Sequence, residues 1–230
     1  MALFLTVHAR YHDVQWGLFN GSQRIVSTAN ESKKISKHFI ETLDRMLKKS
    51  NLSLSDLSFI AVHQGPAPFT TLRVCLSTVN GISYASGLPL VGVNGLEALL
   101  DEQIVPGDQR ITVALLNAFS HDVYYALYDP KSCIRSLGYA HAEKFLMLLK
   151  EQYQEPLTFL GNACPLYEKS IESLFGPQAL LKSVDMVSLE QIAQSALAKW
   201  ENQEISNQIM PIYLKDYSAP PLNPQIIGPH

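Results

Sequence analysis

A run of forty residues, from residue 57 to residue 96, contains Arg73 as its only charged side chain. A helix at a protein surface usually has a charged face opposite its apolar stripe. A helix inside this run must therefore be covered on nearly all sides, either by its own domain or by another protein. Polar residues, glycines and prolines interrupt the run, so it does not read as a membrane span.

The composition of the chain indicates a globular protein. The 230 residues are 47% hydrophobic and 17% charged, which suits one large domain or two small lobes. A net charge of −3 without a basic block argues against strong direct binding of nucleic acid. The three cysteines are far apart and lack CxxC spacing, which fits a reducing compartment. Because the N-terminus has no basic region, we expect no signal peptide, no membrane association and a cytoplasmic location.

The first hundred residues predict a complete small lobe with the order βββαβαβα. Asn20-Gly21 between two apolar runs is typical of a tight hairpin turn. Asn94 followed by Glu97 is a capping-box pattern that would begin the last helix. The predicted strands cover residues 3–7, 14–19, 24–27, 57–62 and 89–93, and the predicted helices begin with 35–47 and 68–86. We assign residues 1–103 to this N-terminal lobe.

A second lobe is predicted for residues 104–217. Ser188 and Gln191 form another capping box, at the start of a helix that places Leu189, Ile192 and Trp200 on one face. The other predicted elements are strands at 111–116, 123–128, 133–137 and 158–160 and a helix at 142–149. Residues 218–230 form a Pro-rich tail without periodicity, which we expect to wrap loosely or to be disordered.

Residues 65–74, GPAPFTTLRV, resemble the segment GPGSFTGLRV of the TsaB (YeaZ) family. Further matches follow in the same order. Residues 87–93 read GLPLVGV, residues 122–128 read DVYYALY beside the family's EVYWALY, and residues 211–215 read PIYLK beside its PxYLR. The resemblance implies an α/β fold of the actin/Hsp70-like (ASKHA) type. It would have two lobes, with a mixed sheet in the N-terminal lobe and a smaller, degenerate C-terminal lobe.

The resemblance also implies a function. Family members are regarded as non-catalytic scaffold subunits that pair with TsaD during synthesis of threonylcarbamoyladenosine in bacterial tRNA, with TsaE as an ATPase in the assembly. Pairing would use the first two helices, and without a partner two copies would form a homodimer, with tRNA contacted only indirectly. The partner-interface residues predicted on this basis are Ile35, Phe39, Leu43, Phe69, Leu72, Arg73, Leu76, Val79 and Asn80.

Several positions depart from the family pattern. His8 and Arg10 stand where members have the acidic residue and hydroxyls of an IDTS segment, and Gly161-Asn162 stands where relatives have GDGA. We therefore interpret His8, Arg10, Gly161 and Asn162 as vestigial nucleotide-site positions, with Asn162 either a turn residue or a residual nucleotide contact. We expect no catalytic residue, no metal and no cofactor in the isolated chain. The sequence leaves open whether a nucleotide binds at the junction with TsaD.

Other interpretations remain. His8 and His12 have the HxxxH spacing of a metal site but lie where a strand turn is expected. Cys164 could be a nucleophile or a buried thiol, and His121 beside Asp122 could be acid–base machinery or a turn. The low-charge helix could also be purely internal. The rival functions are an ATP-dependent transferase or peptidase of the actin-like group, or a general protein-interaction module.

Overall fold

The computed structural model describes residues 2–214, which divide into two compact units. The first unit holds residues 2–98 together with Ser188–Ile212, and the second holds Leu99–Val187 with Tyr213 and Leu214. The predicted Pro-rich tail lies outside the described residues. Within residues 2–214, no helix has both the length and the apolar character needed to cross a bilayer.

The first unit is built on a mixed five-stranded sheet with the order β3-β2-β1-β4-β5. Its strands are β1 (Leu3–Ala9), β2 (Asp13–Asn20), β3 (Gln23–Glu31), β4 (Phe59–His63) and β5 (Leu90–Val93). β2 pairs antiparallel with β1 and β3, whereas β4 pairs parallel with β1 and β5. Gly21 and Ser22 join β2 and β3, and Gly21 has a φ of +58°, so the predicted hairpin is confirmed, with its turn one residue later than predicted.

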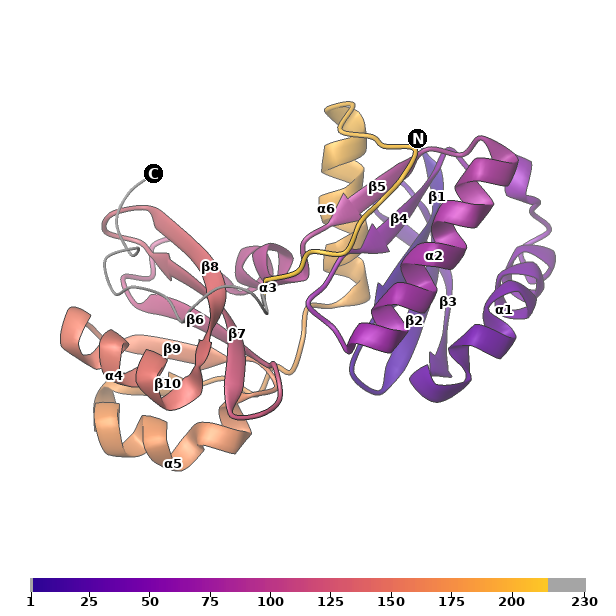
Figure 1. Ribbon diagram of the computed structural model, residues 1–230. Coiled ribbons are helices and arrows are strands. Elements are labelled where there is room, and N and C mark those ends of the chain that lie inside the picture. The colour runs from indigo at the N-terminus through magenta and orange to yellow at the C-terminus, as the bar shows by residue number, and fades with distance from the viewer. Residues whose placement is uncertain (1, 215–230) are drawn as a thin grey trace. The chain divides into compact units, whose positions relative to one another are not determined.

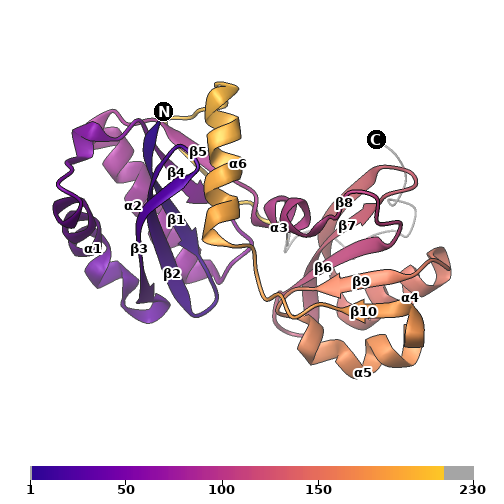
Figure 2. The same cartoon turned by 180° about the vertical axis from the view of Figure 1, so that it is seen from behind.

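Helices cover both faces of this sheet. They are α1 (Ile35–Lys49), α2 (Phe69–Ser86) and α6 (Leu189–Glu201), with short 3₁₀ turns η1 (Ser32–Lys34) and η2 (Leu54–Asp56). Helix α3 (Gly95–Gln103) follows β5, and the division between the two units falls within it, after Ala98. Figures 1 and 2 show α1 and α2 on one face and α6 on the other. Gly87 ends α2 in the left-handed conformation, with a φ of +76°. The predicted order βββαβαβα is therefore confirmed.

Helix α6 departs from the predicted lobe boundary. Residues 188–212 were assigned to the second lobe, but they belong to the first unit. Trp200 of α6 stacks on Phe59 of β4 with ring centroids 4.7 Å apart. The apolar face of α6 is therefore buried against the first sheet, which local sequence patterns do not reveal. Its predicted cap is present, since the Ser188 hydroxyl accepts a hydrogen bond from the Gln191 backbone.

The second unit repeats the topology of the first. Its sheet has the order β10-β9-β6-β7-β8. Read from the other edge, β8-β7-β6-β9-β10, this order matches β3-β2-β1-β4-β5 strand by strand. The elements are β6 (Ile111–Asn117), β7 (Asp122–Asp129), β8 (Ile134–His141), α4 (Ala142–Gln152), β9 (Leu157–Leu160), α5 (Cys164–Phe175), η3 (Gly176–Gln178) and β10 (Ala179–Leu181). The sequence reading missed α5 and β10. Pro165 in the first turn and the buried pair Ile171 and Phe175 were the available signals for α5.

Candidate functional site

Most of the predicted partner-interface residues point into the core of the first unit. Their relative exposures are between 0% and 5%. The buried members are Ile35, Phe39, Leu43, Leu72, Leu76 and Val79. Their spacing of three and four residues places them on the sheet-facing stripes of α1 and α2. The prediction was therefore wrong about which faces of these helices these side chains occupy.

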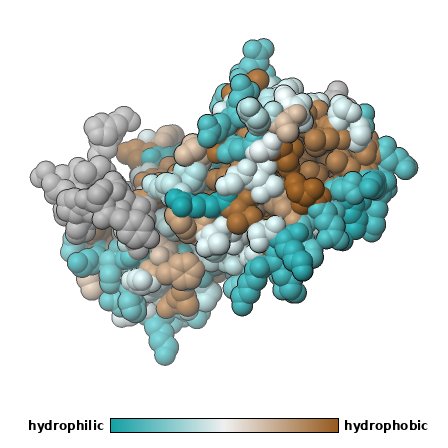
Figure 3. Space-filling view, turned by 45° about the vertical axis from the view of Figure 1, so that its right-hand side comes forward, coloured by the Kyte–Doolittle hydropathy of each residue, from teal (hydrophilic) through white to brown (hydrophobic). Residues whose placement is uncertain are grey.

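The outward face of α2 is nevertheless almost free of charge. Five exposed residues follow one another along this face at spacings of four, four, four and three residues. They are Phe69, Arg73, Ser77, Gly81 and Tyr84. We call these five residues the α2 outer face. Phe69 is 53% exposed and Tyr84 is 93% exposed, values that are unusual for large apolar or aromatic side chains. In Figure 3, hydrophobic and intermediate colours gather on the first unit beside a hydrophilic border.

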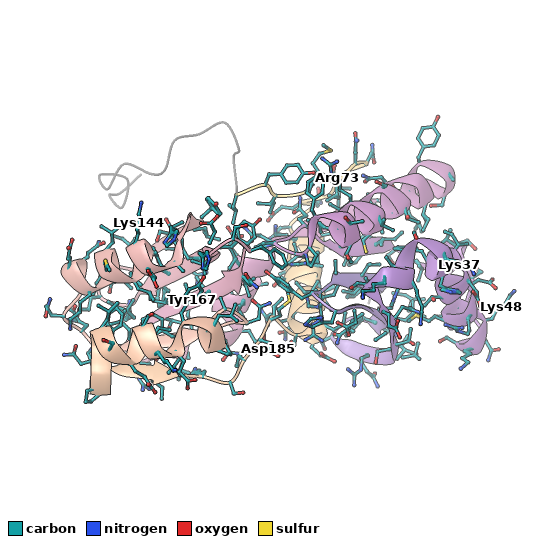
Figure 4. All side chains as sticks on the ribbon, turned by 60° about the horizontal axis from the view of Figure 1, so that its bottom comes forward. Lys37, Lys48, Arg73, Lys144, Tyr167 and Asp185 are labelled. Atoms are coloured by element: carbon teal, nitrogen blue, oxygen red, sulfur yellow. The ribbon has the colours of Figure 1, made fainter. Side chains whose placement is uncertain are left out.

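Two features shape this face. The guanidinium carbon of Arg73 lies 3.9 Å from the centroid of the Phe69 ring. The only charged group of the α2 outer face is therefore in a cation–π contact with an aromatic ring. Figure 4 shows Arg73 on α2, apart from Lys37 and Lys48 of α1. A Cβ atom added at Gly81 would meet no atom within 4 Å. Another helix can therefore approach the backbone closely at this point.

Asn80, which was predicted at the partner interface, binds the backbone of the first unit. Its side chain donates a hydrogen bond to the Ile209 carbonyl at 2.9 Å and accepts one from the Ile209 amide at 2.8 Å. The segment 206–212 is held further by the pairing of Ser206 with Leu90 and by the hydrogen bond from the Ile212 amide to the Gln64 carbonyl. Asn80 thus fastens this C-terminal strap to the flank of α2.

The corner at the end of β1 is filled by two histidines. His8 and His63 are both fully buried, with ring centroids 4.8 Å apart. Burial, the neighbouring His63 and the charge of Arg10 hold the pKa of His8 well below its usual value. Burial lowers the pKa of His63 to about 4, with a backbone contact to Ala9 opposing it only in part. Both rings are therefore neutral near pH 7 and offer no charge to a phosphate.

The remaining space at this corner is small. A Cβ atom added at Gly95 would lie 2.0 Å from Nε2 of His63. Arg10 forms an ion pair with Asp13, at 3.7 Å. His12 lies between β1 and β2, so the predicted turn between these strands is present. The His8 imidazole occupies the position where the family resemblance implied a carboxylate.

The matching corner of the second unit is closed by hydrogen bonds. The side-chain oxygen of Asn162 accepts a hydrogen bond from the Asn117 backbone at 2.8 Å. The side-chain oxygen of Asn117 in turn accepts one from the Phe119 backbone at 2.8 Å. Gly161 has a φ of +107°, and a Cβ atom there would lie 2.1 Å from the Leu115 carbonyl oxygen. Asn162 therefore ties the end of β9 to β6, as a turn residue would.

The other candidate reactive groups lie in the core or in a turn. Cys164 is buried, and burial raises the pKa of its thiol to about 12. His121 lies in a turn of consecutive positive φ values that leads into β7. Among the described residues, no three or more His, Cys, Asp or Glu side chains are grouped to hold a metal ion. These findings favour the turn and buried-thiol interpretations.

Comparisons with known proteins find similarity to proteins named for threonylcarbamoyladenosine in tRNA. The family model described as "TsaD: tRNA N6-adenosine threonylcarbamoyltransferase" matches residues 27–135. The tRNA threonylcarbamoyladenosine biosynthesis protein TsaB of Buchnera aphidicola subsp. Baizongia pistaciae is 24% identical over 78% of this chain and 82% of its own length. The protein of the same name from Haemophilus influenzae is 25% identical over 40% of this chain and 39% of its own length.

Solved structures share the fold of this chain. YeaZ from Pseudomonas aeruginosa has a TM-score of 0.69 at 20% identity, covering 93% of this chain and all of its own. The chain is similar to TsaB (YeaZ) proteins over most of its length. A Pseudomonas aeruginosa protein described as similar to peptidase YeaZ has a TM-score of 0.72 at 18% identity, covering 94% of this chain and all of its own. The actin/Hsp70-like α/β fold expected of a TsaB family member is thereby confirmed.

Proposed function

We propose that this TsaB-like chain is a non-catalytic subunit in the synthesis of threonylcarbamoyladenosine in tRNA, and that it pairs with a TsaD-like transferase through the α2 outer face. The observation that carries the proposal is the exposed stripe of α2 with one charged residue in five. Small uncharged side chains allow helices to approach closely without desolvating charge. The names of the relatives supply the pathway.

The non-catalytic part of the proposal rests on the two filled corners. The neutral His8 and His63 rings replace an acidic group, and Asn162 is engaged with the Asn117 backbone. A metal-bound triphosphate needs carboxylate oxygens and open backbone amides. We therefore propose that the isolated chain does not bind ATP with Mg²⁺, and calorimetric titration should give no heat of binding.

A binding experiment tests the pairing. Ser77→Glu introduces a charge at the centre of the α2 outer face, and we expect it to abolish co-purification with the TsaD-like subunit. Ser173→Glu is the matched control, since Ser173 is an exposed serine on α5 of the second unit. Pairing that survives Ser77→Glu would place the interface elsewhere.

Complementation tests the pathway. In cells depleted of their own TsaB, this chain should restore the modified nucleoside, measured by mass spectrometry of digested tRNA. Pairing without restoration would favour a general interaction module, and tight ATP binding would favour an actin-like transferase. We further propose assembly with a TsaE-like ATPase in the cytoplasm, and self-association through the same face when the partner is absent.

A further inference from the structure

A hollow lies between two helices of the second unit. Its volume is about 320 Å³, which is within the range of sites that bind small molecules. The side chains that line it belong to α4 and α5. They are Glu143, Met147, Lys169, Ser170, Ser173 and Leu174. These residues are separate from the α2 outer face and from the two filled corners, so the proposed function gives the hollow no role.

The strand pairing determines the direction of the two helices. β7 is antiparallel to both β6 and β8, and β9 is parallel to both β6 and β10. β8, β9 and β10 therefore run in the same direction. α4 leads from β8 to β9 and α5 leads from β9 to β10, so both helices run back in the opposite direction. The two helices pack side by side (Figure 1), and Figure 4 shows Lys144 on α4 and Tyr167 on α5.

The hollow has a charged end and an apolar end. On α4, Met147 follows Glu143 after four residues, and on α5, Leu174 follows Lys169 after five. Four residues of helix rise about 6 Å. Because the helices run in the same direction, Glu143 and Lys169 lie toward the end at which the helices begin. Met147 and Leu174 lie one turn further along, and Met147 is 54% exposed, so it is open to a ligand.

The two charges at the first end have opposite signs and are available to a ligand. Glu143 and Lys169 are exposed, and within residues 2–214 they pair neither with each other nor with another side chain. Burial and the nearby Asp122 and Glu143 carboxylates raise the pKa of the Tyr167 hydroxyl, which places the Glu143 carboxylate on the side of α4 that faces α5. The ion pairs in the described part of the second unit use other residues. They are Arg110–Asp108, Lys131–Glu155 and Arg135–Asp101.

We propose that this hollow binds a free amino acid with an apolar side chain. The α-ammonium group of the ligand pairs with Glu143, and its α-carboxylate pairs with Lys169 and accepts a hydrogen bond from the Ser170 hydroxyl. Its side chain packs on Met147 and Leu174. A ligand with one charge would leave one of the two protein charges without a partner. The inference does not depend on pairing with a transferase, because it concerns the second unit alone.

Nuclear magnetic resonance of the full-length chain, labelled with ¹³C at the methionine methyl groups, tests the site. Met147 lies at the apolar end, so its signal reports on the side chain of the ligand. We expect L-leucine to shift this signal with a dissociation constant of about 1 mM, because the charged partners are exposed. Isocaproate, which lacks the ammonium group, and isoamylamine, which lacks the carboxylate, should each bind about tenfold more weakly. The signal of Met210, in the C-terminal strap, should not move.

Variants that remove one charge each give the reciprocal test. Glu143→Gln should weaken leucine binding about tenfold and leave isocaproate binding unchanged. Lys169→Met should weaken leucine binding to the same extent and leave isoamylamine binding unchanged. Lys144→Met and Glu168→Gln are the matched controls, since both residues are exposed on the same helices but do not line the hollow. Both control variants should bind leucine as the parent does.

Three results would overturn the proposal. The first is a Met147 signal that does not respond to leucine at about 10 mM, tenfold above the expected dissociation constant. The second is equal binding of leucine, isocaproate and isoamylamine, which would make the hollow a general apolar surface. The third is an equal loss of leucine binding in Glu143→Gln and in Glu168→Gln. Circular dichroism melting of each variant confirms that the chain is folded in these measurements.

Discussion

Asn80 and Ile209 are 129 residues apart in the chain, yet the Asn80 amide makes hydrogen bonds with both the N–H and the C=O of Ile209. One side chain thus satisfies two backbone groups of the C-terminal strap and fixes the strap beside α2. The same helix presents its outer face to solvent, so α2 connects the packing of the first unit to its proposed interface.

Replacement of Asn80 tests the strap. Asn80→Ala should lower the free energy of unfolding by about 1–3 kcal/mol, because two partly buried backbone groups lose their partner. Urea denaturation of the full chain measures this change. Asn80→Asp keeps the acceptor for the Ile209 amide and should cost less. Equal losses for both variants would contradict the two-bond arrangement.

Acid should destabilise the first unit through His8 and His63. Both folded-state pKa values are lowered, that of His63 to about 4, while an unfolded histidine titrates near 6.5. The stability that the neutral histidines provide is therefore fully present above pH 6.5. The free energy of unfolding falls as the pH drops towards 4, because the unfolded chain then binds more protons than the folded chain. The loss from His63 alone approaches about 3 kcal/mol.

Denaturation at a series of pH values measures this dependence. His63→Leu should flatten the slope between pH 6.5 and 4, whereas His12→Gln, at an exposed position, should leave the slope unchanged. A slope that is the same in all three proteins would show that the buried pair does not control acid stability.

Charges on the two faces of α2 should have opposite consequences. Leu76 is buried in the core, so Leu76→Glu should cost more than about 4 kcal/mol of stability through an unpaired buried charge. Ser77→Glu should leave the melting temperature within a few degrees of the parent and affect only association. Circular dichroism melting and size-exclusion chromatography separate the two effects. A folded Leu76→Glu protein would refute the assignment of faces.

Gly81 provides a steric test of close helix approach. Gly81→Ala should stabilise the chain by about 1 kcal/mol, because alanine favours a helix and the added methyl meets open space. Gly81→Trp should also fold, yet should prevent self-association or pairing, as measured by light scattering. Dimers that tolerate tryptophan at this position would exclude the α2 outer face as the contact.

Gly161 tests the closed corner of the second unit. Gly161→Ala should be strongly destabilising, since its φ is +107° and the new methyl would meet the Leu115 carbonyl. Gly107→Ala is the control, because Gly107 has a φ of +86° but no atom within 4 Å. Thermal melting should rank Gly161→Ala well below Gly107→Ala, and the reverse order would contradict the crowding.

Much of the fold could be predicted from local patterns. The hairpin at Asn20-Gly21, the caps at Asn94 and Ser188 and the order of the first eight elements follow from turn chemistry and apolar spacing. The absence of charge between residues 57 and 96 also indicated a helix with almost no charge on its outer side. These signals act over a few residues, so the sequence contains them directly.

Long-range packing settled the rest. Periodicity identified an apolar stripe on α2 but not that Leu76 and Val79 face the sheet while Ser77 and Gly81 face outward. Periodicity did not predict that α6 belongs to the first unit. It also did not predict that His63 lies against His8 on the neighbouring strand. Such contacts depend on which surfaces are buried together, and that choice is made by the assembled core and not by any single segment.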